Sequence, residues 1–396
     1  MAIRKTALEG IRVLDLGRYQ AAPRAAMELQ RMGAEVIKIE GLEGDESRSV
    51  LPLIRGQSGY WVLYNSGKKS VAIDLRKDKG KDILRQLVKI SDVLVQNFRP
   101  GTIQKMGFDY NVLHQLNPKI IMLNTSAYGQ YGPYKERVGL DLIGQAISGF
   151  MSITGFPENP PTRAGVSIID RITALHGAIG ILAALRERDI SGEGQCIDVC
   201  LADSGFSLTE NALVDYLETG TLMEREGNFR AGSYSGAYST KDGWVALIGQ
   251  SQNIFERICE AIGKPEWKTD PRFSDRNARN ENTEAPMKAL IDWFFSKTVK
   301  EAVDALAQAG IPGTEINNIA QAAAEPHFWE RELMVKVSDP IAGTIHVPGK
   351  FIKLSRSETV IGSPATIGQH NDEIIGGLLK YSPEQLQQLR SEGVIL

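Results

Sequence analysis

The sequence predicts an α/β fold, in which a doubly wound, mainly parallel sheet forms a large domain accompanied by a small α+β domain. First, short apolar segments alternate with helical segments, as in residues 11–16, 23–33 and 35–40. Second, this strand-helix-strand pattern recurs between residues 70 and 96. Third, a hairpin pattern and clustered helical segments replace the alternation from about residue 225.

The elements follow in order from local residue patterns. Pro23 can begin the first helix and Gly33 can end it. The further strands are expected at 70–75, 92–96, 119–124, 195–201 and 343–353, with a hairpin at 238–249 that turns at Asp242–Gly243. The further helices are expected at 83–90, 139–149, 170–185, 204–217, 252–262, 285–295, 299–309, 372–379 and 383–390.

These elements suggest domain limits and a place for a ligand. The large, Rossmann-like domain is expected over residues 1–224, the small domain over 225–330, and 331–396 is expected to return to the large domain. In doubly wound sheets, ligands bind beyond the carboxyl ends of the strands. Residues that directly follow strands are therefore the first candidates for a site.

Composition excludes several classes of function. The 396 residues carry 45 Lys and Arg against 48 Asp and Glu, a net charge of −3, so no basic field favours nucleic acid or an anionic membrane. The first residues lack a signal-peptide core, and no later run is expected to approach a membrane span, so we expect a cytoplasmic protein. Three cysteines form no disulfide framework, and no ligand spacing predicts a metal.

Two loops that follow strands differ in what they predict. Residues 17–23 lack the Gly-x-Gly-x-x-Gly that a dinucleotide requires, which disfavours NAD and flavin. After the strand at 92–96 come Asn97, Phe98 and Arg99, with Lys105 one helical turn later. Positive charge beside an aromatic ring suits a phosphorylated ligand with a flat base, although a solvated turn has the same composition.

Asp170 stands where an apolar segment becomes helical. The helix after it has apolar residues at helical spacing and small residues for close packing, and we expect it to be largely buried. The apolar stripe is Ile172, Leu175, Ile179, Leu182 and Leu185. On spacing alone, an Asp in the first turn is best interpreted as a helix cap. The alternative is a carboxylate nucleophile that the helix terminus keeps ionised.

Ten segments together resemble the class III CoA-transferases, the family of formyl-CoA transferase and carnitine CoA-transferase. The resemblance covers nearly the whole chain, and the segments follow one another in the order of that family. They are residues 8–15, 33–40, 44–48, 68–75, 97–101, 165–170, 194–199, 270–273, 309–312 and 393–395.

The resemblance implies an interlocked dimer of two subunits and a covalent mechanism. Asp170 falls at the family's catalytic aspartate, which forms a mixed anhydride and then an aspartyl-CoA thioester; coenzyme A is a co-substrate, and no metal or NAD is required. The implied CoA contacts are Gln20, Ala21, Ile73, Asp74, Leu75, Arg76, Asn97, Phe98, Arg99, Lys105, Arg137, Leu140 and Asp141. The expected partners are an acyl-CoA donor, a carboxylic acid acceptor and a second subunit, in a homodimer or in a heterodimer with a homologous subunit.

The sequence departs from the family at two places. Leu140 stands where formyl-CoA transferases have tyrosine and the related racemases have histidine, which suggests an acceptor bulkier or more apolar than oxalate. Residues 248–253 replace a glycine-rich lid. Two alternatives to the transferase stay open: an α-methylacyl-CoA racemase, and a CoA-binding subunit without catalysis.

Overall fold

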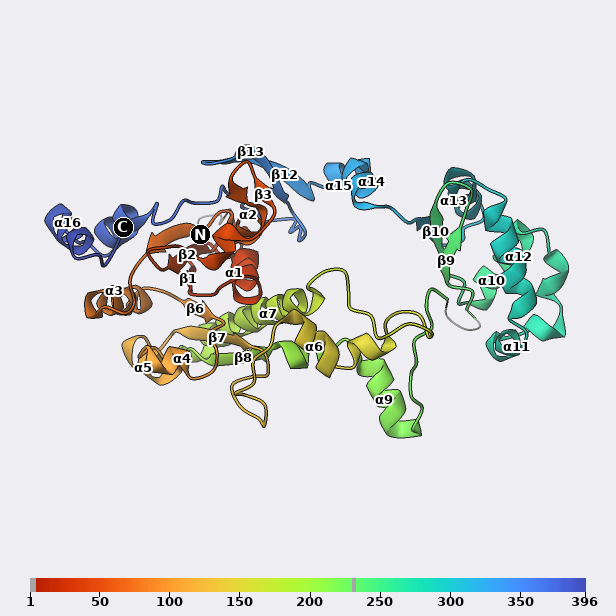
Figure 1. The fold of residues 1–396 in the computed structure, drawn as a ribbon, viewed down its shortest axis with the longest axis horizontal. Coiled ribbons are helices and arrows are strands. Elements are labelled where there is room, and N and C mark those ends of the chain that lie inside the picture. The colour runs from red at the N-terminus through yellow and green to blue at the C-terminus, as the bar shows by residue number, and fades with distance from the viewer. Residues whose placement is uncertain (1–4, 230–232) are drawn as a thin grey trace. The chain divides into compact units, whose positions relative to one another are not determined.

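A six-stranded sheet is the largest feature of the computed structural model, which describes residues 5–229 and 233–396. Its strands are β1 (Arg12–Asp15), β2 (Glu35–Glu40), β5 (Lys69–Ala72), β6 (Val93–Gln96), β7 (Ile121–Ser126) and β8 (Cys196–Cys200). They lie in the order β5-β2-β1-β6-β7-β8, and every neighbouring pair is parallel (Figure 1). The predicted doubly wound parallel sheet is confirmed.

The strand order places a crevice between β1 and β6. From β1 the chain adds β2 and β5 on one side, and then returns to add β6, β7 and β8 on the other side. The loops after β1 and β6 therefore leave the sheet in opposite directions. Such a switch point is where open α/β sheets bind their ligands.

Helices cover both faces of this sheet. Since neighbouring residues of a strand point to opposite sides, they belong to different cores. Val13 contributes to a core with α1 (Ala21–Arg31) and α7 (Ile168–Ser191). Leu14 contributes to the other core, which contains α3 (Asp78–Lys89), α5 (Tyr110–Leu116), η5 (Asp372–Leu378, a π-helix) and α16 (Pro383–Ser391). The α7 backbone lies close to the sheet at Gly177, where an added Cβ would meet Leu123 at 2.8 Å.

The buried face of α7 differs from the predicted apolar stripe. Small residues such as Ala174, Gly177 and Ala178 face α1 and the sheet, whereas Leu175 and Ile179 are 37% and 63% exposed. The expectation of a largely buried helix was wrong on this face, because the close approach to the sheet selects small side chains. By length and composition α7 could also span a membrane, contrary to expectation, but its packing against α1, β7 and β8 is that of a core helix.

The chain divides into two compact units. One comprises Met1–Phe150, Ala164–Asn211 and His327–Leu396, and the other comprises Met151–Arg163 and Ala212–Pro326. The second unit has an antiparallel sheet of β9 (Gly236–Ser239), β10 (Trp244–Leu247) and β11 (Gly313–Glu315). Its core adds α10 (Gln252–Ala261), α12 (Glu284–Phe295) and α13 (Val299–Gln308), as expected of a small α+β fold. The limits 225 and 330 remain a prediction.

Several elements differ from the predicted ones or were not predicted. The helix expected at 204–217 is two helices, α8 (Leu201–Phe206) and α9 (Glu210–Thr219). Neither α2 (Gly59–Asn65) nor β12 (Met334–Asp339), which pairs with β13 (Gly343–Pro348), was predicted. The remaining elements are β3 (Leu53–Ile54), β4 (Gln57–Ser58), α4 (Thr102–Lys105), α6 (Asp141–Ile147), α11 (Arg276–Glu281), α14 (Ile319–Ala324), α15 (Pro326–Glu330) and the 3-10 turns η1 (Glu46–Ser49), η2 (Phe150–Ile153), η3 (Pro265–Lys268) and η4 (Pro271–Phe273).

The last residues of the chain lie along the β5 edge. The Asp74 N–H donates to the Val394 carbonyl at 2.8 Å, and the Ala72 N–H donates to the Asn371 side chain at 3.0 Å. Ile73 and Ile395 form an antiparallel bridge. This edge of the sheet is thus protected by the C-terminal segment.

Candidate active site

Asp170 lies in the first turn of α7 but does not cap it. The cap is Asp141, at the start of α6, whose Oδ1 accepts from the N–H groups of Ile169 at 2.8 Å and Asp170 at 3.1 Å. The Nε2 of Gln145 donates to the other Asp141 oxygen at 2.5 Å. In the described part of the chain the Asp170 carboxylate accepts no hydrogen bond, so its oxygens are free to react.

The surroundings of Asp170 favour its neutral form. Burial, and secondly the charge of Asp141, raise the pKa of Asp170 to about 7, while Arg171 acts in the opposite direction. Near neutral pH a large fraction of the carboxyl group is therefore ionised, and that ion is poorly solvated. A carboxylate in this state is a better nucleophile than a hydrated one.

Gln20 connects the start of α1 to the start of α7. It is buried at the N-cap position of α1, where its Nε2 donates to the Ser167 carbonyl at 3.4 Å and its Oε1 accepts from the Tyr60 hydroxyl at 3.2 Å. Ala21, the first residue of α1, is also buried. The structure thus places Gln20 beside the turn that carries Asp170, and brings in Tyr60, which the sequence did not indicate.

A cavity of about 560 Å³ opens at the switch point of the sheet. Five of the predicted CoA contacts line it, namely Ile73, Asp74, Leu75, Arg76 and Phe98. The loop after β1 contributes Leu16 and Arg18, and α4 contributes Thr102 at its start and Met106 directly after its end. The site therefore draws on the carboxyl ends of β1, β2, β5 and β6.

The other predicted contacts lie outside this lining. Asn97 holds the β1–α1 loop, because its side chain accepts from the Arg18 N–H at 2.7 Å and donates to the Arg18 carbonyl at 2.8 Å. Arg99 and Lys105 are exposed. The Arg137 guanidinium lies 3.7 Å from the ring centroid of Tyr134.

Leu140 and Asp141 belong to the surroundings of Asp170 rather than to the cavity. Leu140 is the N-cap residue of α6 and is 76% exposed. The Asp141 carboxylate is engaged by the α7 backbone and Gln145. Contact with CoA remains a prediction for all thirteen residues, including the five that line the cavity.

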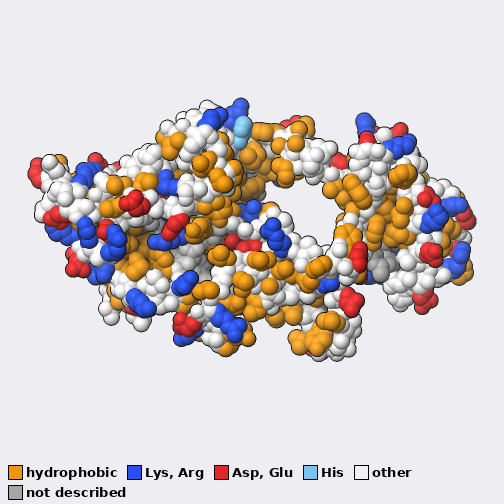
Figure 2. All heavy atoms as spheres, viewed as in Figure 1, with side chains coloured by type: hydrophobic (Ala, Val, Ile, Leu, Met, Phe, Trp, Pro, Cys, Tyr) orange, Lys and Arg blue, Asp and Glu red, His pale blue; other side chains and the backbone are white. Residues whose placement is uncertain are grey.

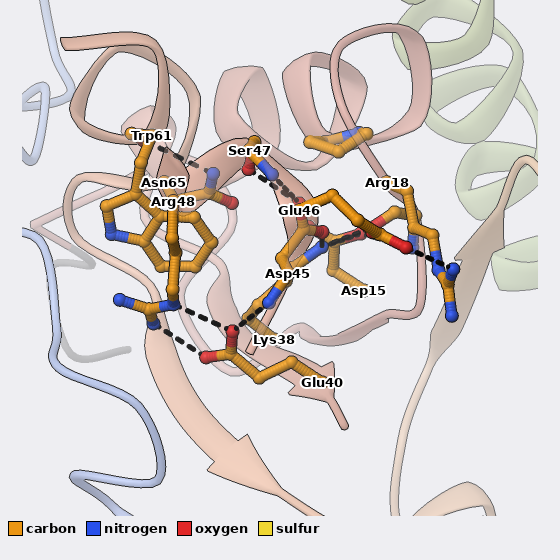
Figure 3. A network of polar contacts seen from close by, with 12 residues as sticks. Asp15, Arg18, Lys38, Glu40, Asp45, Glu46, Ser47, Arg48, Trp61 and Asn65 are labelled. Carbon is orange, nitrogen blue, oxygen red and sulfur yellow. Dashed lines mark hydrogen bonds and ion pairs between the residues drawn. The ribbon is translucent and has the colours of Figure 1, made fainter. Parts of the chain in front are cut away.

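Residues 41–46, in the loop after β2, also line the cavity. Buried ion pairs hold this loop (Figure 3). Lys38 binds Asp45 at 2.9 Å, Arg48 binds Glu40 at 2.7 Å, and the Arg48 guanidinium lies 3.5 Å from the Trp61 ring centroid. Burial alone would raise the pKa of Asp45, but Lys38 and Ser47 hold it below its usual value. The loop is therefore a fixed wall.

Arg18 is a cavity residue that sequence reasoning missed. Its guanidinium lies 5.4 Å from the Phe98 ring centroid and pairs with Glu46 at 2.6 Å. It follows β1 directly, so its position after a strand was the available signal. In residues 5–229 and 233–396 no three His, Cys, Asp or Glu side chains gather into a group that could hold a metal ion.

Comparison with known proteins gives consistent matches over the whole length. The family model "CoA-transferase family III" matches residues 8–371. A succinyl-CoA–D-citramalate CoA-transferase of Chloroflexus aurantiacus is 36% identical over 98% of both chains, and the beta subunit of its succinyl-CoA–L-malate CoA-transferase is 33% identical over 98% of both. A solved CAIB/BAIF family protein of Brucella suis is 30% identical, with a TM-score of 0.84 over 95% of this chain and 100% of that one.

Proposed function

This chain belongs to CoA-transferase family III, and we propose that it moves CoA from an acyl-CoA donor to a carboxylic acid through a covalent intermediate on Asp170. The observation that supports this role is the state of that carboxylate. It lies half-buried at a helix N-terminus, has a pKa raised to about 7 chiefly by burial, and accepts no hydrogen bond from the described residues.

The proposed reaction has four acyl transfers and consumes no other reagent. The ionised Asp170 attacks the donor thioester, which releases CoA thiolate and leaves a mixed anhydride. The thiolate attacks the aspartyl carbonyl, which releases the donor acid and leaves an aspartyl-CoA thioester. The acceptor carboxylate attacks that thioester to give a second anhydride and thiolate, and the thiolate then attacks the acceptor carbonyl and restores Asp170.

The cavity suits a CoA ester in its apolar lining and in its charge. Phe98, Leu75 and Met106 offer apolar surface for a flat base. Its acidic lining residues are largely neutralised, as Asp74 is by Arg76 at 2.8 Å. Arg99 and Lys105 make no ion pair within the described chain and remain available for phosphates.

We assign four of the other predicted contacts, Gln20, Ala21, Leu140 and Asp141, to the thioester end of the ligand. Gln20 and Ala21 lie at the start of α1, and Gln20 is bonded to the turn that bears Asp170. Leu140 and Asp141 start α6 beside the same turn. The two curated relatives take succinyl-CoA as donor, so succinyl-CoA is the first donor to assay.

The covalent route is tested by trapping. Incubation with an acyl-CoA donor and then hydroxylamine should convert Asp170 to a hydroxamate, detected by peptide mass spectrometry, because only an activated aspartyl carbonyl reacts. Asp170→Asn should lose transfer by at least a thousandfold, as expected for a missing nucleophile. The matched control is Asp189→Asn, at the exposed far end of α7, which should keep both activity and trapping at Asp170.

One outcome would assign the chain to the racemase alternative. A racemase needs an acid and a base on opposite sides of the α-carbon. Leu140 offers no ionisable group, and the Asp141 carboxylate is bound to the α7 backbone. Rapid exchange of the α-hydrogen of a 2-methylacyl-CoA with deuterium oxide, with an unmodified Asp170 peptide, would overturn the proposal.

A further inference from the structure

Four buried charged side chains form a network next to the loop that joins β1 to α1. Lys38 pairs with Asp45 at 2.9 Å and lies 4.0 Å from Asp15, and Lys68 pairs with Asp15 at 2.7 Å (Figure 3). Each of the four side chains is at most 3% exposed. Buried ion pairs stabilise a fold only weakly, because removing charges from water offsets much of their attraction. Stability alone therefore does not account for this network.

The network bonds directly to the backbone of the β1–α1 loop. The Gly17 N–H donates to Asp15 Oδ1 at 2.8 Å, and the Gly17 carbonyl accepts from Lys38 Nζ. At the other end of the loop, Lys68 Nζ donates to the Pro23 carbonyl at 2.7 Å. Both ends of the loop are therefore held by buried charges.

Both lysines carry the protons that these bonds require. Burial would lower the pKa of Lys38, but the charges of Asp15 and Asp45 outweigh it and raise that pKa. Burial lowers the pKa of Lys68 to about 8, against the charge of Asp15. At pH 7 both amines are thus mainly protonated, and Lys68 directs its three donors to Asp15, to Asn65 and to the loop.

The loop has a strained backbone between its two ends. Tyr19 has a φ of 59°, the left-handed region that a residue with a Cβ rarely adopts. Such a conformation persists only where the surroundings hold it. Asn97 bonds to the N–H and the carbonyl of Arg18, and a Cβ added at Gly17 would meet Ala22 at 2.6 Å. The loop is therefore held on every side that the network does not reach.

This strained turn places two side chains of the candidate site. Arg18, directly before Tyr19, lines the cavity. Gln20, directly after it, donates to the Ser167 carbonyl at 3.4 Å, at the start of the helix that carries Asp170. A shift of the loop would therefore disturb the cavity wall and the surroundings of the nucleophile together.

We propose that Lys38 and Lys68 are positioning residues for the transfer reaction, because with Asp15 they hold the β1–α1 loop in its strained form. The loop in turn sets Arg18 against the CoA cavity and Gln20 against the turn of the proposed nucleophile. This inference rests on the proposed function. Neither lysine lines the cavity, so their effect reaches the ligand through the loop backbone.

The first test removes one charge of each sign and keeps polar groups in place. In the double variant Asp15→Asn/Lys68→Gln, asparagine retains an oxygen for the Gly17 N–H, and Lys38 keeps its pair with Asp45. In protein that circular dichroism shows to be folded, kcat/KM with succinyl-CoA should fall by about a hundredfold, the usual effect of misplaced groups near the reacting atoms. The Kd for free CoA, measured by titration calorimetry, should rise by about tenfold.

The control removes a partly buried ion pair elsewhere in the same unit. Arg188 pairs with Asp92 at 2.9 Å in the last turn of α7. Arg188→Gln should lower the Tm and leave kcat/KM and the Kd for CoA unchanged. An equal loss of activity in this variant would assign the effect to stability.

A further variant separates positioning from a general loss of stability. Glycine adopts a positive φ without strain. Tyr19→Gly should therefore return about tenfold of the lost kcat/KM in the double variant and bring no gain in the wild type. A network that only stabilises the fold predicts the same effect of Tyr19→Gly in both proteins. Gly17→Ala displaces the loop while every charge stays, and it should lower kcat/KM and CoA affinity in the same way as the double variant.

The outcomes distinguish this inference from the proposed function. A folded double variant with the kcat/KM and CoA affinity of an active wild type would overturn the positioning role and leave the transferase intact. An equal effect of Tyr19→Gly in both proteins would do the same. If the double variant does not fold, unchanged constants in Gly17→Ala overturn the role instead. A wild type that neither binds CoA nor transfers it would overturn the proposed function and this inference together.

Discussion

At the scale of single residues, two carboxylates with different roles, those of Asp141 and Asp170, lie at the start of α7. Asp141 satisfies the Ile169 and Asp170 amides and thereby fixes the turn, which leaves the Asp170 oxygens unbonded. Burial is the main cause that raises the pKa of Asp170, and the negative charge of Asp141 is the second. Together they keep part of the Asp170 population protonated. We therefore regard Asp141 as a positioning residue that also raises the pKa of the proposed nucleophile.

The first prediction concerns the pH dependence of transfer. In the proposed mechanism only the ionised carboxylate attacks, so kcat/KM for the donor should rise with pH and level off above a midpoint near the Asp170 pKa of about 7. Asp141→Asn keeps an oxygen that can cap α7 but removes the charge, so the midpoint should fall, although burial should keep it above the ordinary 3.8. An unchanged midpoint in this variant would contradict the role of Asp141.

The second prediction concerns stability. The pKa of Asp170 is higher in the folded chain than its ordinary value of 3.8, so the folded state is progressively penalised as pH rises from about 4 to about 7. Asp170→Asn removes this penalty. Its Tm should exceed that of the wild type more at pH 8 than at pH 4, measured by calorimetry. A Tm difference that is constant or shrinks with pH would argue against the raised pKa.

At the scale of elements, the loop after β2 is held by ion pairs and hydrogen bonds between residues of different elements, which a local sequence pattern does not predict. Glu40 is buried at the end of β2 and binds both Arg48 and the Asp45 N–H, the latter at 2.9 Å. Trp61 on α2 covers the Arg48 guanidinium. The cavity wall is thus fixed by contacts that span three elements.

The third prediction tests this wall. Arg48→Ala leaves Glu40 buried and unpaired, so the free energy of unfolding should fall by about 3 kcal/mol, and KM for CoA esters should rise because the loop loses its anchor. Chemical denaturation and steady-state kinetics measure the two effects. The control is Arg85→Ala, which removes an exposed pair and should change neither quantity appreciably. A stable Arg48→Ala protein with unchanged KM would show that the loop needs no such anchor.

The sequence predicted elements where periodicity is strong and failed where tertiary contacts decide. The strand at 35–40 was located to the residue, because its apolar run lies between two loops. α2 was missed, since its seven residues carry Tyr60, Trp61 and Tyr64, whose burial depends on distant partners. The same reason explains the site. The position of Asp170 at a helix start follows from the sequence pattern, but its proposed role as nucleophile comes only from the family resemblance. Arg18 and Asp141 acquire their contacts only when the strands and helices meet.

At the scale of the whole molecule, several helices expose apolar side chains that no described residue covers. On α6, Leu142, Ile143 and Ile147 are each at least 40% exposed. No residue of α9 is buried, and Figure 2 shows hydrophobic side chains gathered at the surface along that helix. Apolar faces of this kind mark surfaces that bind another protein. A second copy of the chain is the partner we propose, and the relatives that work as alpha and beta subunits make a homologous chain the alternative.

The fourth prediction tests whether a second copy covers these faces. The pure chain should elute as a species of about twice its 43.5 kDa, measured by size exclusion with light scattering, and this species should carry the transferase activity. Ile179→Glu places a charge on the exposed face of α7, where the side chain is 63% exposed, and should therefore shift the population to monomer or to aggregate. Ile90→Glu is the control, because Ile90 is 41% exposed at the end of α3, which covers the face of the sheet opposite to α7. An active wild-type monomer would contradict the dimer, and a dimer that forms only after a homologous subunit is added would favour the mixed assembly.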